Sequence, residues 1–333
     1  MNPFALVRPR SHEEAARVMA SGDYRLPVLK AGGLDVVDHL KEGLLEPDAL
    51  VDVRGVRRRP DAPVVEREGD RLVLEATATL AALAEDPLVR GSAPAVATAC
   101  GSAATPQVRA VATAAGNLLQ RPRCWYYRHD QFDCLKKGGD RCFAIDGENA
   151  YHAILGGAGC YIVHPSNLAV ALSVLDGRVH LVGGERDHLP IADLFQSPSR
   201  GVRREHVLEP REVVTHLSLV PAPRSAYLAI KHKQSFDWPL VSAAAALELD
   251  GGRIRAARIC AGAVAPIPWR LPAVEQALVG IDPRDDGGLR TACAGAADGA
   301  RPLRDNGYKV RLLPVVVRRA VRLAAGLLAV EEE

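Results

Sequence analysis

Four of the seven cysteines lie in one segment of the chain, at Cys124, Cys134, Cys142 and Cys160. So many thiols in one segment suggest a redox metal centre rather than part of a hydrophobic core. The spacing C-x9-C-x7-C-x17-C contains no C-x-x-C pair, so it differs from common zinc fingers and from the compact ferredoxin motif. From the residues alone three interpretations stay open: a 4Fe-4S cluster held by four thiolates, a structural zinc site, or a loop of unligated cysteines.

Other residues near these cysteines bear on the same question. His129, His152 and His164 could each replace one ligand, although a loop histidine is more often structural or solvent-facing. Basic residues in the same segment would offset the negative charge of four thiolates; they are Arg121, Arg123, Lys136, Lys137 and Arg141. The remaining cysteines lie in alanine-rich or β-branched surroundings and are expected to be small buried apolar residues; these are Cys100, Cys260 and Cys293.

Two turns built from small residues could hold a cofactor. Residues 30–35 (KAGGLD) follow an apolar strand-like run and precede an amphipathic stretch. Adjacent glycines let backbone N–H groups approach a ligand closely, and a helix start beyond them favours a pyrophosphate. Residues 113–117 (TAAGN) could present a hydroxyl, an amide and bare backbone. Taken singly, each pattern is also typical of an ordinary structural turn, and without G-x-G-x-x-G or a Walker sequence, a Rossmann or P-loop site is disfavoured.

Composition excludes several classes of protein. The 333 residues suffice for two or three domains, and 48% hydrophobic with 25% charged residues is ordinary for a globular protein. A net charge of +2 gives no reason to expect nucleic-acid binding. Seven cysteines are too few for a secreted disulfide framework. No run of about 18 apolar residues predicts a membrane span, and no signal peptide is evident, so we expect a protein of the reducing cytosol.

The pattern predicts three regions. Residues 1–60 read as a small α/β unit, with a helix that begins at a capping box formed by Ser11 and Glu14. Residues 61–220 contain short strands, an alanine-rich helix over 79–100, and the cysteine segment, taken as residues 121–163. Residues 221–333 contain two apolar runs joined at 250–252 (DGG), which predicts a β-hairpin, and an amphipathic helix over 315–330. The chain shows no Ser/His/Asp series, H-E-x-x-H or paired carboxylates that would indicate a hydrolytic site.

Several motifs taken together resemble one known family. They are KAGGLDVVDHLKEG, ATPQVRAVATAAGNLLQRPRCWYYR, CLKKGGDRC, GENAYHAILGG, HPSNLAVAL, KHKQSFDWPLVSAAAAL, VAPIPWR and DNGYKV. On these motifs the chain resembles the FAD-binding subunit of the molybdenum hydroxylases, the xanthine dehydrogenase family. Within that family it is most similar to the aldehyde oxidoreductase and 4-hydroxybenzoyl-CoA reductase type, whose flavin subunit carries an inserted 4Fe-4S loop. The resemblance extends over nearly the whole chain.

The resemblance implies a fold and a set of cofactor-binding residues. The implied fold is α+β: a two-subdomain FAD-binding domain of the vanillyl-alcohol-oxidase type, then a C-terminal domain with a three-stranded antiparallel sheet and helices. The first turn would wrap the FAD pyrophosphate with Leu29, Lys30, Ala31, Gly32, Gly33, Leu34, Asp35 and Val36. Further FAD contacts would come from Ala104, Thr113, Ala115, Gly116, Asn117, Gln120, Ser166, Asn167, Leu217 and Lys231. The resemblance selects iron over zinc and makes the four segment cysteines the cluster ligands.

The same resemblance implies a role in electron transfer. The chain would belong to a heterotrimer with a molybdopterin-binding large subunit and a 2Fe-2S small subunit, and would pass electrons to an external acceptor. Substrate oxidation would take place in the large subunit, so no catalytic residue is expected here. Alternatives are a free-standing flavin reductase of the same fold and a zinc-loop interaction module. The expected location is cytoplasmic, or periplasmic by co-export with a partner that carries a signal.

Overall fold

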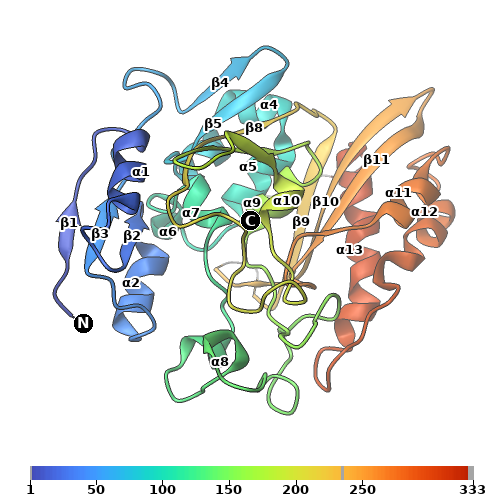
Figure 1. Cartoon of the computed structure of the whole chain (residues 1–333). Coiled ribbons are helices and arrows are strands. Elements are labelled where there is room, and N and C mark those ends of the chain that lie inside the picture. Colours follow the sequence, from blue (N-terminus) through green and yellow to red (C-terminus); the bar gives the residue numbers. More distant parts are fainter. Residues whose placement is uncertain (1, 234–235, 329–333) are drawn as a thin grey trace.

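Three β-sheets organise the residues that the computed structural model describes, which are 2–233 and 236–328. A three-stranded sheet belongs to the N-terminal unit, a five-stranded sheet to the middle region and a four-stranded sheet to the C-terminal region. Figure 1 shows these parts following one another across the molecule, with the cysteine segment around its green helix at one edge. The predicted α+β class is confirmed. No described helix is both long and apolar enough to cross a membrane.

The N-terminal unit is a parallel sheet with two helices. Its strands are, in spatial order, β1 (Ala5–Val7), β3 (Ala49–Asp52) and β2 (Pro27–Lys30), and its helices are α1 (His12–Ala20) and α2 (Leu34–Lys41). Ser11 begins α1 as predicted, since its Oγ accepts from the N–H of Glu14 at 3.1 Å. The Glu14 carboxylate accepts from the N–H of Arg10 at 2.7 Å, one residue earlier than in an ideal capping box. The pattern does not predict β1, which is only three residues long.

The alanine-rich stretch of the middle region forms three short helices instead of the single predicted helix over 79–100. They are α3 (Leu80–Glu85), α4 (Pro87–Ser92) and α5 (Pro94–Gly101). Proline lacks an N–H and pushes the preceding residue out of the helical conformation, so Pro87 and Pro94 each end one helix and begin the next. Asp86 is extended and caps α4 through its side chain. The prediction of one helix was therefore wrong, because the two prolines outweigh the helix propensity of alanine.

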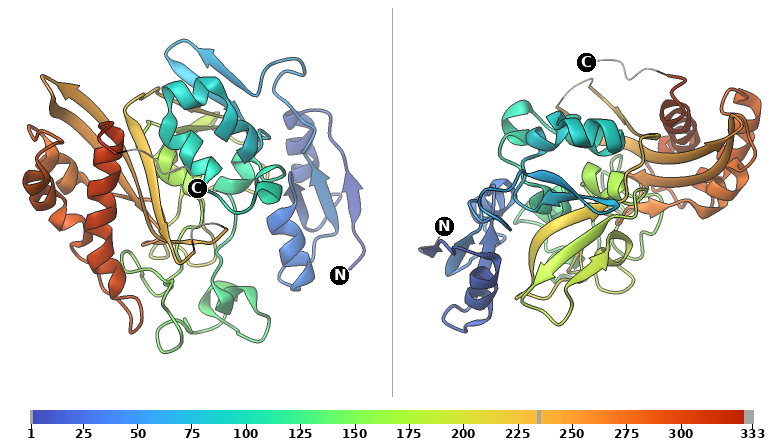
Figure 2. Two further views of the ribbon diagram at one scale, coloured as in Figure 1. Left: turned by 180° about the vertical axis from the view of Figure 1, so that it is seen from behind. Right: turned by 90° about the horizontal axis from the view of Figure 1, so that it is seen from above.

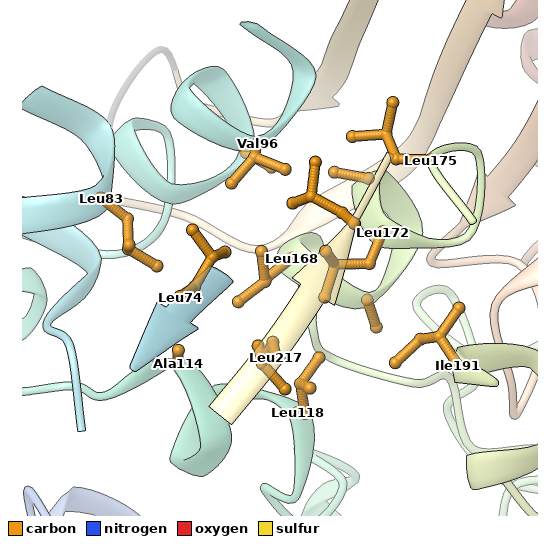
Figure 3. Packing of buried hydrophobic residues seen from close by; sticks show 14 of the residues in the cluster. Leu74, Leu83, Val96, Ala114, Leu118, Leu168, Leu172, Leu175, Ile191 and Leu217 are labelled. Atoms are coloured by element: carbon orange, nitrogen blue, oxygen red, sulfur yellow. The ribbon is translucent and has the colours of Figure 1, made fainter. Parts of the chain in front are cut away.

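The main hydrophobic core lies between these helices and an antiparallel sheet. In spatial order its strands are β4 (Val65–Glu68), β5 (Arg71–Glu75), β8 (Val213–Leu219), β6 (Arg178–Val182) and β7 (His188–Pro190). Helices α9 (Asn167–Leu172) and α10 (Ile191–Leu194) complete it. Figure 3 shows Leu217 of β8 among Leu74, Leu168 and Leu118 from other elements. Cys100 is fully buried in this core, as predicted.

The C-terminal region covers one face of a second antiparallel sheet with helices. The strands are β12 (Trp269–Arg270), β11 (Arg253–Gly262), β10 (Pro239–Asp250) and β9 (Ser225–Lys231). The helices are α11 (Pro272–Leu278), α12 (Asp286–Cys293) and α13 (Tyr308–Ala324). The predicted hairpin joins β10 to β11 through Gly251 and Gly252, both at positive φ. The sheet has the three expected long strands and the two-residue β12 besides; Cys260 and Cys293 are buried as predicted.

The final amphipathic helix begins earlier in the sequence than the pattern predicts. The pattern predicts it over 315–330, whereas α13 begins at Tyr308 and contains Pro314 in its first two turns. Positions 329–330 of the predicted helix lie outside the described residues. Figure 2 shows α13 lying along the sheet from two further sides, and its buried residues join the core of the C-terminal region.

We expect Leu217→Ala to lower the free energy of unfolding by about 2–5 kcal/mol, because the fully buried side chain leaves a cavity in the main core. Denaturant titration of the purified protein measures this change. Leu6→Ala is the matched control, because Leu6 is 48% exposed in β1 and its truncation should cost far less. Equal losses in the two variants would contradict the position of Leu217 in the core.

Candidate functional site

A cavity of about 490 Å³ lies between the N-terminal unit and the middle region. We call it the main cavity. Its volume falls in the usual range of ligand pockets, roughly 300–1,000 Å³. Both predicted turns contribute to its wall. Of the residues implied to contact FAD, those that line it are Leu29, Ala31, Gly32, Gly33, Leu34, Asp35, Val36, Ala104, Thr113, Ala115, Gly116, Asn117, Gln120 and Asn167.

Close packing of backbone holds the first turn in place. A Cβ atom on Gly32 would collide with the carbonyl oxygen of Val111, which lies just before the second turn. Gly33 has φ 83° and precedes α2, a left-handed conformation that favours glycine. Gly32 is therefore required for the close approach to Val111, and Gly33 is favoured by its left-handed backbone conformation. This arrangement leaves bare backbone facing the cavity.

The second turn begins the short helix α7 (Ala114–Leu118). Thr113 caps this helix, because its Oγ1 accepts from the N–H of Gly116 at 3.2 Å. The Asn117 side chain accepts from the hydroxyl of Ser166 at 2.7 Å, and its backbone oxygen accepts from the Gln120 amide at 2.9 Å. Ser166 in turn caps α9. The polar residues of this wall are thus fixed by bonds to one another.

Asp35 is the negative charge of the first turn, and cations surround it. Its carboxylate lies 2.7 Å from the guanidinium of Arg128 and 3.1 Å from that of Arg123. Burial favours the neutral acid, but these two cations outweigh it, so the pKa of Asp35 is lowered. It is therefore ionised at neutral pH. Because its charge is compensated locally, it does not repel an anion in the cavity.

Four residues implied to contact FAD do not line the main cavity. Lys30 pairs with Asp52 at 3.0 Å, and Ser166 acts through Asn117 as described. Leu217 is fully buried in the main core, and Lys231 donates to the carbonyl of Ser102 at 2.9 Å. The sequence reasoning also missed residues that do line the cavity: Val53, Leu80, Val108, Val213, Val214, Phe236 and Trp238. Apolar wall residues carry no signal that separates them from core residues.

The cysteine segment folds as an irregular loop around α8 (Trp125–Arg128) and the 3-10 turn η1 (Leu135–Lys137). Cys134 and Cys160 are buried, and Cys124 and Cys142 are half-buried. Backbone N–H groups lie close enough to three of the sulfurs to lower their pKa: those of Tyr126 and Tyr127 act on Cys124, those of Ala144, Ile145 and Tyr161 on Cys142, and that of Ile162 on Cys160. Donors of this kind stabilise thiolate ligands.

The thiols affect one another electrostatically. A hydrogen bond from Cys160, supported by the backbone donors, lowers the pKa of Cys142 to about 6. The same bond, together with burial, raises the pKa of Cys160. Burial, with smaller contributions from the charges of Cys142 and Cys134, raises the pKa of Cys124 to about 12. Each of the four sulfurs therefore lies close enough to at least one of the others for the two to interact. Among the described residues, however, no three His, Cys, Asp or Glu side chains converge tightly enough to hold a single metal ion.

Most of the basic residues near the cysteines have other partners. Lys136 is buried and donates to Glu205 at 2.6 Å, and Arg121 pairs with the same carboxylate at 2.7 Å. Lys137 donates to the backbone carbonyl of His129, and Arg141 lies over the ring of Phe143. These cations tie the loop to the middle region or stay within the loop. Of these cations, Lys136 lowers the pKa of Cys160, against the larger raising effects of the bond to Cys142 and of burial.

A second cavity of about 280 Å³ adjoins the main cavity and reaches the cysteine segment. Residues that border both cavities are Arg123, Pro165, Asn167, Asp237, Trp238 and Pro239. Cys124, Trp125 and His152 form part of the wall on the side of the loop. His152 is buried, and burial lowers its pKa to about 4, so the ring is neutral. Inside the loop, the ring of Tyr126 stacks on that of Phe143, and the ring of Phe132 packs edge-to-face with both.

Two family models match the chain. Residues 2–223 match the model described as the FAD binding domain in molybdopterin dehydrogenase. Residues 225–324 match the CO dehydrogenase flavoprotein C-terminal domain. The chain is 32% identical over 286 residues to the aldehyde oxidoreductase FAD-binding subunit PaoB of Escherichia coli (strain K12), covering 84% of this chain and 86% of that protein.

Solved structures share the fold at lower identity. The carbon monoxide dehydrogenase of Hydrogenophaga pseudoflava that lacks the Mo-pyranopterin moiety matches with a TM-score of 0.74 and 23% identity, over 98% of this chain and 99% of that chain. Quinoline 2-oxidoreductase from Pseudomonas putida 86 matches with a TM-score of 0.75 and 22% identity, over 98% of this chain and 99% of that chain.

The contact between α2 and the cysteine segment should make stability depend on pH. His39 of α2 donates from Nδ1 to the carbonyl of Asp35 at 2.7 Å, so its Nε2 accepts from the hydroxyl of Tyr127 at 3.0 Å. Burial lowers the pKa of His39, so the unfolded chain takes up a proton first as pH falls below about 6.5. Above that pH, neutral His39 contributes to the stability of the folded state. As the pH falls from the pKa of the unfolded chain to the lower pKa of the folded protein, this contribution is lost.

We expect His39→Gln to reduce the loss of unfolding free energy between pH 7 and pH 5, by up to about 1.4 kcal/mol per pH unit. Urea denaturation at several pH values measures the slope. His129→Gln is the control, because His129 lies on the surface of the loop with its side chain 52% exposed. An unchanged slope in His39→Gln would show that His39 is not buried as a neutral group.

Proposed function

Because the chain belongs to the family of FAD-binding subunits of molybdenum hydroxylases, we propose that it binds FAD in the main cavity and transfers electrons within a molybdenum-containing oxidoreductase. One observation supports the main cavity as the FAD site. Two turns far apart in the sequence line this same cavity with bare backbone and with polar groups fixed by hydrogen bonds. When bound, FAD accepts two electrons and can release them singly or as a pair. The described residues of the chain fit this cofactor.

We assign the two turns to the charged part of FAD. Backbone N–H groups of the first turn, next to the start of α2, suit a pyrophosphate, and the ion pairs of Asp35 with Arg123 and Arg128 keep that turn from repelling it. Thr113 and Asn117 of the second turn line the same cavity, and their hydrogen bonds hold them in position to contact the cofactor. Ala115 and Asn167 stand where the family usually has glycine and aspartate; both line the cavity, so both are compatible with contact.

Lys231 remains a proposed FAD residue although it does not line the main cavity. Its ammonium group lies on the carbonyl of Ser102, close in sequence to Ala103 and Ala104, which do line it. A cation near the part of the cavity wall formed by Ala103 and Ala104 would stabilise the negative charge that develops on the reduced cofactor. Leu217 also stays a prediction; Val213 and Val214 of the same strand line the main cavity.

We further propose that Cys124, Cys134, Cys142 and Cys160 bind a 4Fe-4S cluster. Two observations support it: backbone N–H groups lie near three of the sulfurs and favour their thiolate form, and no single-ion site forms among the described residues. A cubane needs its four sulfurs farther apart than one zinc ion does. A zinc-loop module is therefore the weaker alternative. The PaoB relative is described as a FAD-binding subunit of an aldehyde oxidoreductase, which agrees with a redox role.

The proposed partners are a molybdopterin-binding large subunit and a 2Fe-2S small subunit, with an external electron acceptor. We propose a cytoplasmic location, or a periplasmic one by co-export, and a division of the chain near residues 60 and 220. A free-standing flavin reductase is the second candidate function. It would reduce an acceptor with NAD(P)H in the absence of any other subunit.

The protein purified with its co-expressed partners should show flavin absorbance, and Gly32→Ala should bind FAD at least about tenfold more weakly. The added Cβ must displace either the first turn or Val111, which moves the wall of the main cavity. Flavin fluorescence after release from the protein gives FAD per chain. Gly55→Ala is the matched control, because a Cβ there meets no atom within 4 Å. Absence of flavin from the wild-type complex would refute the proposed function.

Cys134→Ala should lose most of the iron bound to this chain, whereas Cys293→Ala should keep it. Cys134 is a proposed ligand, and Cys293 is a buried core residue of α12. Metal analysis with the electron paramagnetic resonance spectrum of the reduced protein measures both variants. Zinc in place of iron, or equal iron in the two variants, would contradict the proposed cluster.

A further inference from the structure

His152 is fixed against one of the proposed cluster ligands. Its Nε2 lies 3.3 Å from the sulfur of Cys124, and the residue is only 3% exposed. The edge of the Trp125 ring packs against the imidazole, with centroids 5.1 Å apart. Bonds to the backbone fix the residue on both sides: its N–H donates to Asn149 at 3.0 Å, and its carbonyl accepts from Asn306 at 3.1 Å. The imidazole therefore has little freedom to leave the sulfur.

The direction of this contact follows from the chemistry of a ligand sulfur. An iron-bound cysteine is a thiolate and has no proton to donate, so the bond requires Nε2–H of His152 as donor and the sulfur as acceptor. The other nitrogen, Nδ1, is buried without a hydrogen-bond partner. Among the described residues that contact Cys124, His152 is the one whose side chain can donate, since the other donors are backbone N–H groups.

We propose that His152 is a positioning residue that raises the reduction potential of the cluster through an N–H to sulfur hydrogen bond on Cys124. This inference rests on the proposed 4Fe-4S cluster. The reduced cluster carries one more electron, part of which resides on the ligand sulfurs, so a donor on a sulfur stabilises the reduced form more than the oxidised form. Burial strengthens the effect, because water does not compete for the sulfur.

His129 provides the comparison within the same loop. It could equally have been a cluster residue from the sequence, but its ring pairs with Asp130 at 3.2 Å and is 52% exposed. It also contacts the ring of Phe132 rather than any sulfur. Replacing His129 therefore changes a histidine of the loop without changing a donor to a ligand.

The test is a redox titration of the purified complex, followed by electron paramagnetic resonance, for the wild type and four variants. At the wild-type midpoint potential, His152→Leu should lower the ratio of reduced to oxidised cluster about tenfold, equivalent to about 59 mV for one electron. His152→Asn should behave in the same way, because its amide is too short to reach the sulfur. His152→Gln, whose amide N–H can reach it, should stay near the wild type, and His129→Leu should not differ from it.

Several outcomes would overturn the inference while leaving the FAD proposal intact. An unchanged midpoint in both His152→Leu and His152→Asn would do so. Conversion of the cluster to a three-iron form in these variants would make His152 a ligand instead. Loss of all iron in both variants, with FAD content preserved, would make the role structural. A wild-type complex with flavin but no iron removes the cluster and this inference together, whereas a complex without flavin contradicts the function itself.

Discussion

The contact between Gly32 and the carbonyl of Val111 is the constraint on which the proposed FAD site depends. It brings the turn of the N-terminal unit against the segment that leads into the second turn, closer than any side chain would allow. Both turns consequently face one cavity, although some 80 residues separate them in the sequence. The two turns rest on different cores, because the first packs on the small core of the N-terminal unit and the second on the main core of the middle region.

The cysteine segment is held in the same arrangement by contacts to all three regions. Arg128 reaches Asp35 and Asp38 of the N-terminal unit, and Lys136 reaches Glu205 of the middle region. In the C-terminal region, buried Lys309 of α13 donates to the carbonyl of Tyr151 at 2.8 Å and to that of Ala263 at 2.7 Å. A loop with little regular structure is thereby fixed next to the main cavity. Loss of one anchor would still leave two.

Features that depend on a few neighbouring residues could be predicted from the sequence. The capping residue Ser11, the hairpin at Gly251 and Gly252, and both small-residue turns are local and were recognised. The continuity of the helix over 79–100 was misjudged because alanine propensity was given more weight than Pro87 and Pro94. The apolar wall residues, such as Val213 and Val214, could not be identified, because burial against a cavity and burial in a core require the same residue types. The imidazole of His152 could be noticed as a candidate, but its distance to one sulfur required the fold.

Amide hydrogen exchange with and without added FAD tests the central claim most directly, since it reports on both turns in one experiment. The account predicts that FAD slows exchange in residues 29–36 and in residues 113–120, and leaves the hairpin at residues 250–253 unchanged. Protection confined to one of the two turns, or found only outside them, would contradict a cofactor held between the N-terminal unit and the middle region.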